Sequence, residues 1–218
     1  MDKNFYRGKR IFLSGHTGFK GAWLSLWLMK MGAKVSGFSL APEKESLFNI
    51  LDLASQLEES TIGDIRNFTL LEKKLKNFQP EIVIHMAAQA LVRPSYADPR
   101  LTYETNVIGT LNVFEAVRKA GSVKALVNIT TDKCYENKEI NHNYCEDDPL
   151  GGYDPYSSSK ACAEILTSSY RRSFFEKEGI AAGSVRAGNV IGGGDFSVDR
   201  IIPDIFRSIR DKKEVELR

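Results

Sequence analysis

The sequence predicts an α/β fold in which a doubly wound parallel sheet carries helices on both faces. Two observations predict it. Short, mostly apolar runs rich in β-branched residues alternate with longer helical patterns, and these runs lack a polar side. Strands without a polar side are typical of a parallel sheet covered by helices. The predicted strands are Arg10–Ser14, Lys34–Ser39, Ser60–Gly63, Glu81–Met86, Val123–Thr130 and Ile180–Arg186.

The helical patterns fall between these strands. The predicted helices are Phe19–Met31, Asn67–Phe78, Leu101–Ala120, Pro155–Glu178 and Ile201–Arg210, with a poorly determined helical stretch between Glu45 and Glu58. A further strand is expected to begin at 214–217. We therefore expect one cofactor-binding domain over residues 1–187. Residues 188–218 are expected to be only the start of a truncated substrate-binding region.

Composition is that of an ordinary soluble globular protein. The chain has 218 residues, 42% hydrophobic and 27% charged, with a formal net charge of +2. Without a basic run, nucleic acid and anionic membranes are not expected as partners. The most hydrophobic stretch, 19–31, contains two lysines and is shorter than the roughly 20 residues of a membrane span. The polar N-terminus predicts no signal peptide, and a cytoplasmic location is expected.

Cysteine and histidine usage predicts no metal site. Three of each occur, without the spacing of metal ligands. The cysteines are expected to be reduced thiols. They are Cys134, Cys145 and Cys162, and the histidines are His16, His85 and His142.

A glycine-rich turn follows the first predicted strand directly. It reads Gly15-His-Thr-Gly18-Phe-Lys-Gly21 and opens the first helix. In a Rossmann fold the first glycine permits a tight turn, the second admits a pyrophosphate, and the third allows close helix–strand packing. The helix N-terminus attracts the phosphates. Dinucleotide binding is predicted here, against the alternative of a merely structural turn, for Gly15, Thr17, Gly18, Phe19, Lys20 and Gly21.

Further candidate cofactor contacts follow the second, third and fourth strands. Asp64, followed by Ile65, can accept a hydrogen bond from an adenine amine, or else cap a helix. Ala87, Ala88 and Gln89 offer small residues where a cofactor passes. The acidic residue that normally binds the adenine ribose is absent, and Ser39 stands there instead. The choice between NAD and NADP therefore stays open on these residues.

The pair Tyr156 and Lys160 is a candidate acid–base site. A spacing of four places both side chains on one helix face. The ammonium of Lys160 is expected to lower the pKa of Tyr156, so that the phenol acts as a general base toward an alcohol. By itself such a pair is equally typical of a helix surface.

Three polar residues end the fifth predicted strand, at the sheet edge where ligands bind in this fold class. Thr131 can hydrogen-bond a substrate hydroxyl. Asp132 can serve as an acid if burial raises its pKa, and Lys133 as a base only if its pKa falls. The alternative is a loop of solvated charges.

Together these motifs resemble the extended short-chain dehydrogenase/reductase family, the NAD-dependent epimerases and dehydratases. Within it the chain is most similar to nucleotide-sugar 4,6-dehydratases. Related dehydratases carry a glutamate where Lys133 stands, and the Thr-Asp-Lys sequence points to the type that acts on CDP-glucose. The resemblance covers nearly the whole chain. It is carried by residues 15–21, 85–93, 131–135, 148–160 and 186–195.

The resemblance implies a hydro-lyase. In such enzymes bound NAD oxidises C4 of the sugar, water leaves across C5 and C6, and C6 is then reduced, giving CDP-4-keto-6-deoxyglucose. It implies Tyr156 as the C4 base and Thr131 near O4. Asp132 becomes the acid at O6, and Lys133 stands where relatives place the base for the C5 proton.

The resemblance also implies substrate contacts and an assembly. Asn189, supported by Arg186, would reach the substrate diphosphate, and Arg93 is a further phosphate or sugar contact. A homodimer through the helices at 101–120 and 155–178 is implied as well. Two other functions stay open: another nucleotide-sugar epimerase or dehydratase, and a catalytically silent NAD-binding fragment.

Overall fold

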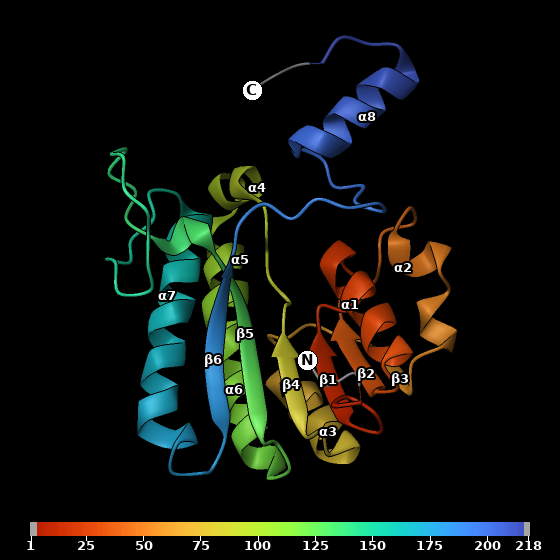
Figure 1. Ribbon diagram of the computed structural model, residues 1–218, viewed down its shortest axis with the longest axis vertical. Coiled ribbons are helices and arrows are strands. Elements are labelled where there is room, and N and C mark those ends of the chain that lie inside the picture. Colours follow the sequence, from red (N-terminus) through yellow and green to blue (C-terminus); the bar gives the residue numbers. More distant parts are fainter. Residues whose placement is uncertain (1–3, 216–218) are drawn as a thin grey trace.

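A six-stranded parallel sheet organises the chain. The computed structural model describes residues 4–215, and its strands run in the order β3-β2-β1-β4-β5-β6 (Figure 1). Every pair of neighbouring strands is parallel, which confirms the predicted doubly wound Rossmann sheet. The strands are β1 (Arg10–Ser14), β2 (Lys34–Ser39), β3 (Glu59–Ile62), β4 (Ile82–His85), β5 (Ala125–Thr131) and β6 (Ala181–Ala187).

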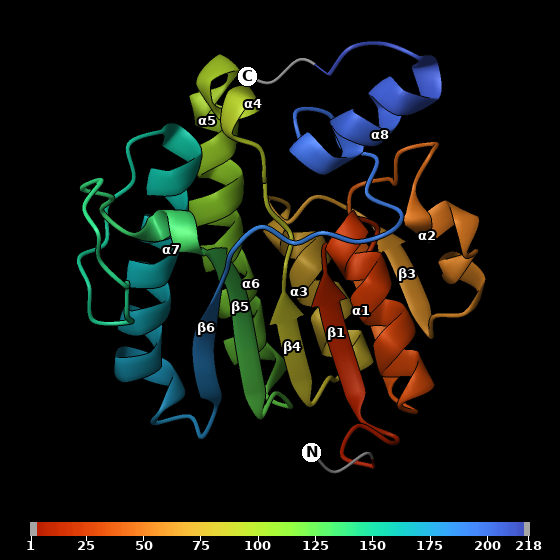
Figure 2. The ribbon, with the colours of Figure 1, turned by 45° about the horizontal axis from the view of Figure 1, so that its top comes forward.

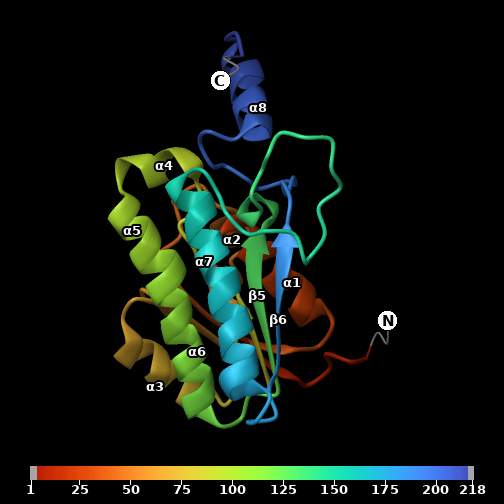
Figure 3. The ribbon, with the colours of Figure 1, turned by 90° about the vertical axis from the view of Figure 1, so that its left-hand side faces the viewer.

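Helices cover both faces of this sheet. On one face α3 (Phe68–Phe78), α6 (Gly109–Ala120) and α7 (Pro155–Tyr170) lie side by side, as Figure 3 shows from the edge. On the other face lie α1 (Phe19–Lys30) and the short α2 (Leu47–Ile50). The remaining helical elements are η1 (Leu53–Ser55), α4 (Val92–Ala97), α5 (Pro99–Tyr103), η2 (Glu104–Ile108), η3 (Asp132–Cys134), η4 (Arg171–Phe175) and α8 (Ile201–Asp211).

Two hydrophobic cores explain why the strands read as apolar on both sides. Phe12 of β1 points into the core under α3 and α6. Its neighbours Ile11 and Leu13 point into the core under α1. All three are fully buried, because successive residues of a strand face opposite sides.

Two predicted helices are interrupted. The stretch predicted as one helix over 101–120 divides into α5, the π-helical turn η2 and α6, and the stretch over 155–178 ends in the π-helical turn η4. At η2 the buried side-chain amide of Asn106 donates to the Gln89 carbonyl and the Ser159 hydroxyl. A tertiary contact of this kind does not alter the hydrophobic periodicity of the sequence. The short helix α4 was not predicted either, because it is too short to show a periodic pattern.

After β6 the chain crosses the carboxyl edge of the sheet toward α1 and α2 (Figure 2). The indole N–H of Trp23 donates to the Gly193 carbonyl at 2.9 Å. Gly194 adopts a φ of +81°, and a Cβ there would meet Leu47 of α2 at 2.8 Å. The chain then forms α8, which buries none of its side chains. Of the strand predicted at 214–217, residues 214 and 215 have no regular structure and the others lie outside the described residues.

Candidate active site

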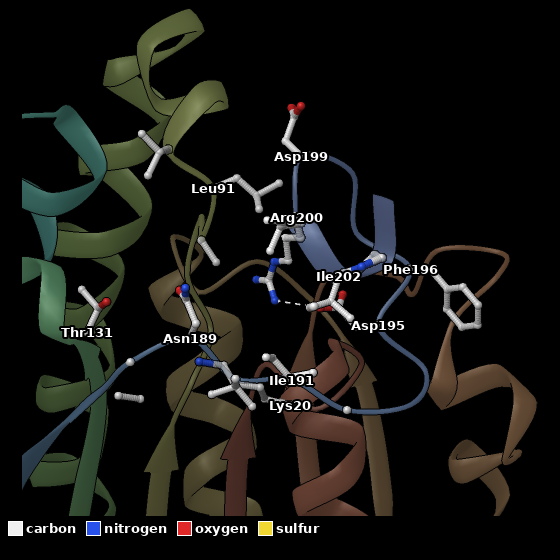
Figure 4. Close-up of a pocket in the computed structure, with 18 of the residues that line it drawn as sticks. Lys20, Leu91, Thr131, Asn189, Ile191, Asp195, Phe196, Asp199, Arg200 and Ile202 are labelled. Carbon is white, nitrogen blue, oxygen red and sulfur yellow. Dashed lines mark hydrogen bonds and ion pairs between the residues drawn. The ribbon is translucent and has the colours of Figure 1, made fainter. Parts of the chain in front are cut away.

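A cavity of about 970 Å³ opens at the carboxyl edge of the sheet, where Rossmann folds bind ligands. Its walls come from the end of β5, the start of α7, the loop before α4, the segment after β6 and α8. Figure 4 shows Lys20, Thr131, Asn189 and Arg200 around this space, each from a different part of the chain.

Lys20 of the glycine turn lines the cavity, and the three glycines of the turn differ in their surroundings. A Cβ on Gly15, whose φ is +82°, would lie 2.7 Å from the backbone nitrogen of Ala87, and one on Gly21 only 2.0 Å from the Gly15 oxygen. A Cβ on Gly18 would make only an ordinary contact, at 3.5 Å from the Gly15 oxygen. Gly15 and Gly21 are therefore required by the packing of the turn, while the Cα of Gly18 has free space beside it, as the approach of a pyrophosphate requires.

The end of β2 presents hydroxyls instead of a carboxylate. Thr17 donates to the Leu40 carbonyl at 2.9 Å, and its oxygen lies 2.8 Å from the Ser39 hydroxyl. Because the carbonyl takes the single Thr17 proton, Ser39 donates to Thr17 and its own oxygen can accept from a further donor.

Asp64 and Ile65 follow β3. Asp64 can offer a ligand its carboxylate, and Ile65 can offer only its backbone. The Asp64 carboxylate pairs with Arg66 at 2.7 Å, and this hydrogen bond holds the pKa of Asp64 below its ordinary value. The alternative that Asp64 caps α3 is wrong, because Asn67 caps it by accepting from the backbone of Leu70. Ile65 buries its side chain in the core, so its backbone is the part that a ligand can reach.

The residues after β4 have two roles: some leave room for a ligand, and others hold the loop in place. Ser14 accepts hydrogen bonds from the backbone of Ala87 and its predecessor, which holds this segment against the glycine turn. The side-chain amide of Gln89 is occupied by the backbone of Leu91 and by Thr102. Gln89 therefore shapes the loop, and the small side chains of Ala87 and Ala88 leave the room.

Thr131 and Tyr156 line the cavity together, and Lys160 lies behind them. The phenol of Tyr156 is hydrogen-bonded to Thr131, and the Lys160 ammonium donates to the Ile129 carbonyl at 3.1 Å. Burial, and then the charge of Lys20, lower the pKa of Lys160 to about 8.

The predicted lowering of the Tyr156 pKa by Lys160 is not what the structure shows. Burial raises the pKa of Tyr156 above its ordinary value, against the opposing effects of Thr131 and the charge of Arg200. The reason is that the phenol is only 8% exposed, and desolvation disfavours a phenolate.

Asp132 and Lys133 form the first turn of η3 and are both exposed. Thr131 donates to the Asp132 carboxylate at 3.1 Å. Lys133 lines the cavity, whereas Asp132 faces the end of β6 near Gly188. The structure thus brings both beside Thr131 without burying either.

The three predicted substrate contacts lie in different environments. Asn189 and Arg93 line the cavity, and Arg93 pairs with Asp199 at 3.3 Å across its mouth. Arg186 does not line it: its guanidinium pairs with the buried Glu164 at 3.0 Å. A direct contact of Arg186 with substrate therefore does not fit this placement, because its charge is already satisfied inside the protein.

Arg200 is the site residue that sequence reasoning missed. Its guanidinium points into the cavity and is held at 3.0 Å by the buried Asp195 (Figure 4). Its charge acts on both Tyr156 and Lys20. In the sequence this pair stands in a glycine-rich stretch without periodicity, where charged residues normally indicate a solvated loop.

Two buried histidines, one inside the glycine turn and one at the end of β4, predict acid sensitivity. Burial lowers the pKa of His16 to about 4 and that of His85 to about 3. Below pH 6.5 the two imidazoles take up protons in the unfolded chain but stay neutral in the folded chain. The free energy of unfolding therefore falls as the pH falls. We expect each histidine to lower the free energy of unfolding by about 2 kcal/mol between pH 7 and pH 5.

Urea unfolding at the two pH values measures this loss. His85→Gln removes one of the two titrating groups and should reduce the loss to about half. Equal unfolding free energies of the parent at pH 7 and pH 5 would contradict the prediction.

Neither a metal-ligand cluster nor a membrane-spanning helix is found among residues 4–215. Among residues 4–215 no cluster of three or more His, Cys, Asp or Glu side chains is placed to hold a metal ion. No helix in the described part of the chain is long and apolar enough to cross a bilayer. Cys134 is buried and the other two cysteines are exposed, all three as free thiols.

Comparison with known proteins assigns the family. The profile of the NAD dependent epimerase/dehydratase family matches residues 11–218, and the chain belongs to this family. Among curated relatives, the CDP-glucose 4,6-dehydratase of Salmonella typhimurium is 56% identical over the whole chain. The chain spans 62% of the length of that relative.

Solved structures agree with this assignment. The dTDP-glucose 4,6-dehydratase of Bacillus anthracis, in complex with NAD, has a TM-score of 0.80 and 25% identity. The match covers 95% of this chain and 63% of that one. The DesIV dTDP-glucose 4,6-dehydratase of Streptomyces venezuelae, with NAD bound, also has a TM-score of 0.80 and 25% identity, covering 93% of this chain and 62% of that one.

Proposed function

We propose that the protein provides the NAD-binding and catalytic part of a nucleotide-sugar 4,6-dehydratase acting on CDP-glucose. The observation that carries the proposal is one cavity that is lined by Thr131, by Tyr156 and by Lys20 of a glycine turn that fits a pyrophosphate. The 56% identity to a CDP-glucose 4,6-dehydratase supports the substrate.

The proposed cofactor is NAD, and the glycine turn at 15–21 supplies its phosphate site. Ser39 is proposed to accept a hydrogen bond from a hydroxyl of the adenine ribose. The Asp64 carboxylate and the Ile65 backbone are proposed to receive the adenine. Ala87 and Ala88 supply the close passage between these sites and Tyr156.

Tyr156 is proposed to accept the proton of the sugar 4-hydroxyl. When bound, NAD⁺ would accept the hydride from C4, and its reduced form would return the hydride to C6. With its raised pKa, the phenol holds its proton until cationic charge stabilises the phenolate. Arg200 provides such charge, and Thr131 orients the phenol.

Water loss is assigned to η3. Asp132 is proposed to protonate the leaving 6-hydroxyl, and Lys133 occupies the position of the base for the C5 proton. The 4-keto group acidifies that proton.

The substrate diphosphate is proposed to bind between Asn189, Arg93 and Arg200. All three line the cavity, and the two guanidiniums offer forked donors that suit phosphate oxygens. In this assignment residues 1–187 form the cofactor domain. Residues 188–218 begin the substrate-binding region.

A homodimer in the cytoplasm is proposed as the working form, serving polysaccharide synthesis. The helical layer that contains α5, η2 and α7 (Figure 3) supports the dimer. It exposes large apolar side chains at Leu101 of α5, Ile108 of η2 and Ile165 of α7.

Incubation of the protein and NAD⁺ with CDP-, dTDP-, GDP- and UDP-glucose tests the function by mass spectrometry. We expect loss of one water from CDP-glucose alone. Water loss from another nucleotide sugar would indicate a different dehydratase. Binding of NAD without turnover of any sugar would indicate a silent cofactor-binding fragment.

A further inference from the structure

Glu164 is a buried carboxylate to which the proposed mechanism gives no role. It lies on α7, one turn after Lys160, and is only 5% exposed. It accepts a hydrogen bond from the Thr130 hydroxyl, one from Ser184 at 2.8 Å and one from the Arg186 guanidinium at 3.0 Å. One side chain of α7 thus binds both β5 and β6.

Arg186 extends these contacts to the loop after η3. Its second terminal nitrogen donates to the Glu146 carbonyl at 3.1 Å. The guanidinium carbon also lies 4.7 Å from the centre of the Tyr135 ring, and Tyr135 directly follows η3. The same guanidinium therefore joins Glu164 to the segment that carries Asp132 and Lys133.

Every candidate catalytic residue lies on an element that this ion pair contacts. Thr131 follows Thr130 on β5, Asp132 and Lys133 precede Tyr135, and Tyr156 and Lys160 lie on α7 with Glu164. Burying two charges costs desolvation free energy, so a buried ion pair that only joined three elements would stabilise the fold little. Its geometry or its charge is therefore expected to serve the site.

The charge of Glu164 acts directly on Lys160. The charged and titratable groups that act on Lys160 are Lys20 of α1, Glu164 of α7, Cys134 of η3 and His85 of β4. Glu164 raises the pKa of Lys160, against the lowering by burial and by Lys20.

We propose that Glu164 and Arg186 are positioning residues: the pair aligns the ends of β5 and η3 with α7, and the Glu164 carboxylate places a buried negative charge one helical turn from Lys160. This proposal rests on the proposed function and gives Arg186 a role behind the catalytic residues in place of a contact with substrate.

Glu164→Gln tests the charge with little change in shape. The first readout is the titration of the Lys160 ε-carbon, followed by NMR in lysine-labelled protein and assigned with Lys160→Arg. We expect the midpoint to move to lower pH in Glu164→Gln. Glu115→Gln is the matched control, because the partners of Glu115 are Arg118 and Tyr170, which lie outside the site. An unmoved Lys160 midpoint in Glu164→Gln overturns the charge role whether or not the protein turns over any sugar.

The second readout is the pH profile of CDP-glucose turnover. We expect Glu164→Gln to lower kcat by about tenfold to a hundredfold, with the alkaline limb moved to lower pH, because misplaced catalytic groups cost that much. Unchanged kcat and pH profile, with only a lower melting temperature, would make the pair merely structural. If the parent fails to turn over CDP-glucose, the proposed function fails and the NMR titration still decides this inference.

Arg186→Lys separates alignment from charge and serves if Glu164→Gln does not fold. An ammonium still pairs with Glu164 but cannot also reach Glu146 and stack on Tyr135. We expect a lower kcat with an unmoved Lys160 midpoint. Parent-like kcat in Arg186→Lys would overturn the alignment role.

Discussion

Tyr156→Phe is expected to lower kcat for CDP-glucose by at least about a thousandfold, since a positioned general base contributes roughly 10²–10⁴ in rate. The phenol is the proposed proton acceptor, and its hydroxyl is the only group that the substitution removes. NAD binding should be retained, because the glycine turn and Lys160 are unchanged. Stopped assays analysed by mass spectrometry give kcat, and calorimetric titration gives the dissociation constant of NAD.

Tyr153→Phe is the matched control for this substitution. Tyr153 stands three residues earlier and is fully exposed, so the loss of its hydroxyl should leave kcat unchanged. Parent-like turnover by Tyr156→Phe would remove the general-base role and, with it, the proposed mechanism.

Gly21→Ala is expected to abolish measurable NAD binding. The new Cβ would lie 2.0 Å from the carbonyl oxygen of Gly15 and 2.8 Å from the Cα of His16, both rigid backbone atoms. Either α1 or the phosphate-binding turn must move. We expect the free energy of unfolding to fall by about 1–3 kcal/mol, as is usual for overpacking, and NAD affinity to fall by more than about a hundredfold.

Gly18→Ala separates binding from folding. The new Cβ would lie 3.5 Å from the Gly15 oxygen, an ordinary contact distance, so the variant should melt close to the parent temperature. NAD affinity should nevertheless fall, since the methyl group occupies the approach of the pyrophosphate. Gly183→Ala on β6, where a Cβ meets nothing within 4 Å, should change neither quantity. Parent-like NAD affinity in both Gly18→Ala and Gly21→Ala would show that the turn is merely structural.

The sheet was predictable because strands that are buried on both faces carry apolar residues at successive positions of the sequence. The predicted bounds of β1 and β2 match the structure, and both strands carry core residues on each face. The limits of the prediction lie where tertiary contacts decide. The π-helical turn at Asn106 depends on Gln89 and Ser159, which are distant in the chain. No local pattern specifies such a contact.

The candidate site was predictable to the extent that motif spacing determines geometry. Gly15, Gly18 and Gly21 act through their own backbone, and Tyr156 and Lys160 share one helix face, so spacing alone describes them. The environment of these groups was not predictable. The raised pKa of Tyr156 comes from burial, and the position of Arg200 depends on where the segment after β6 crosses the sheet.

The hydrogen bond from Trp23 to Gly193 joins residues 170 positions apart, in the first helix and in the segment that follows the last strand. Closing so long a loop costs chain entropy, and that cost is recovered only when the intervening strands have already paired. We therefore expect α1 and the segment after β6 to meet late in folding. The indole of Trp23 ties the helix that begins at the glycine turn to the segment that carries Arg200.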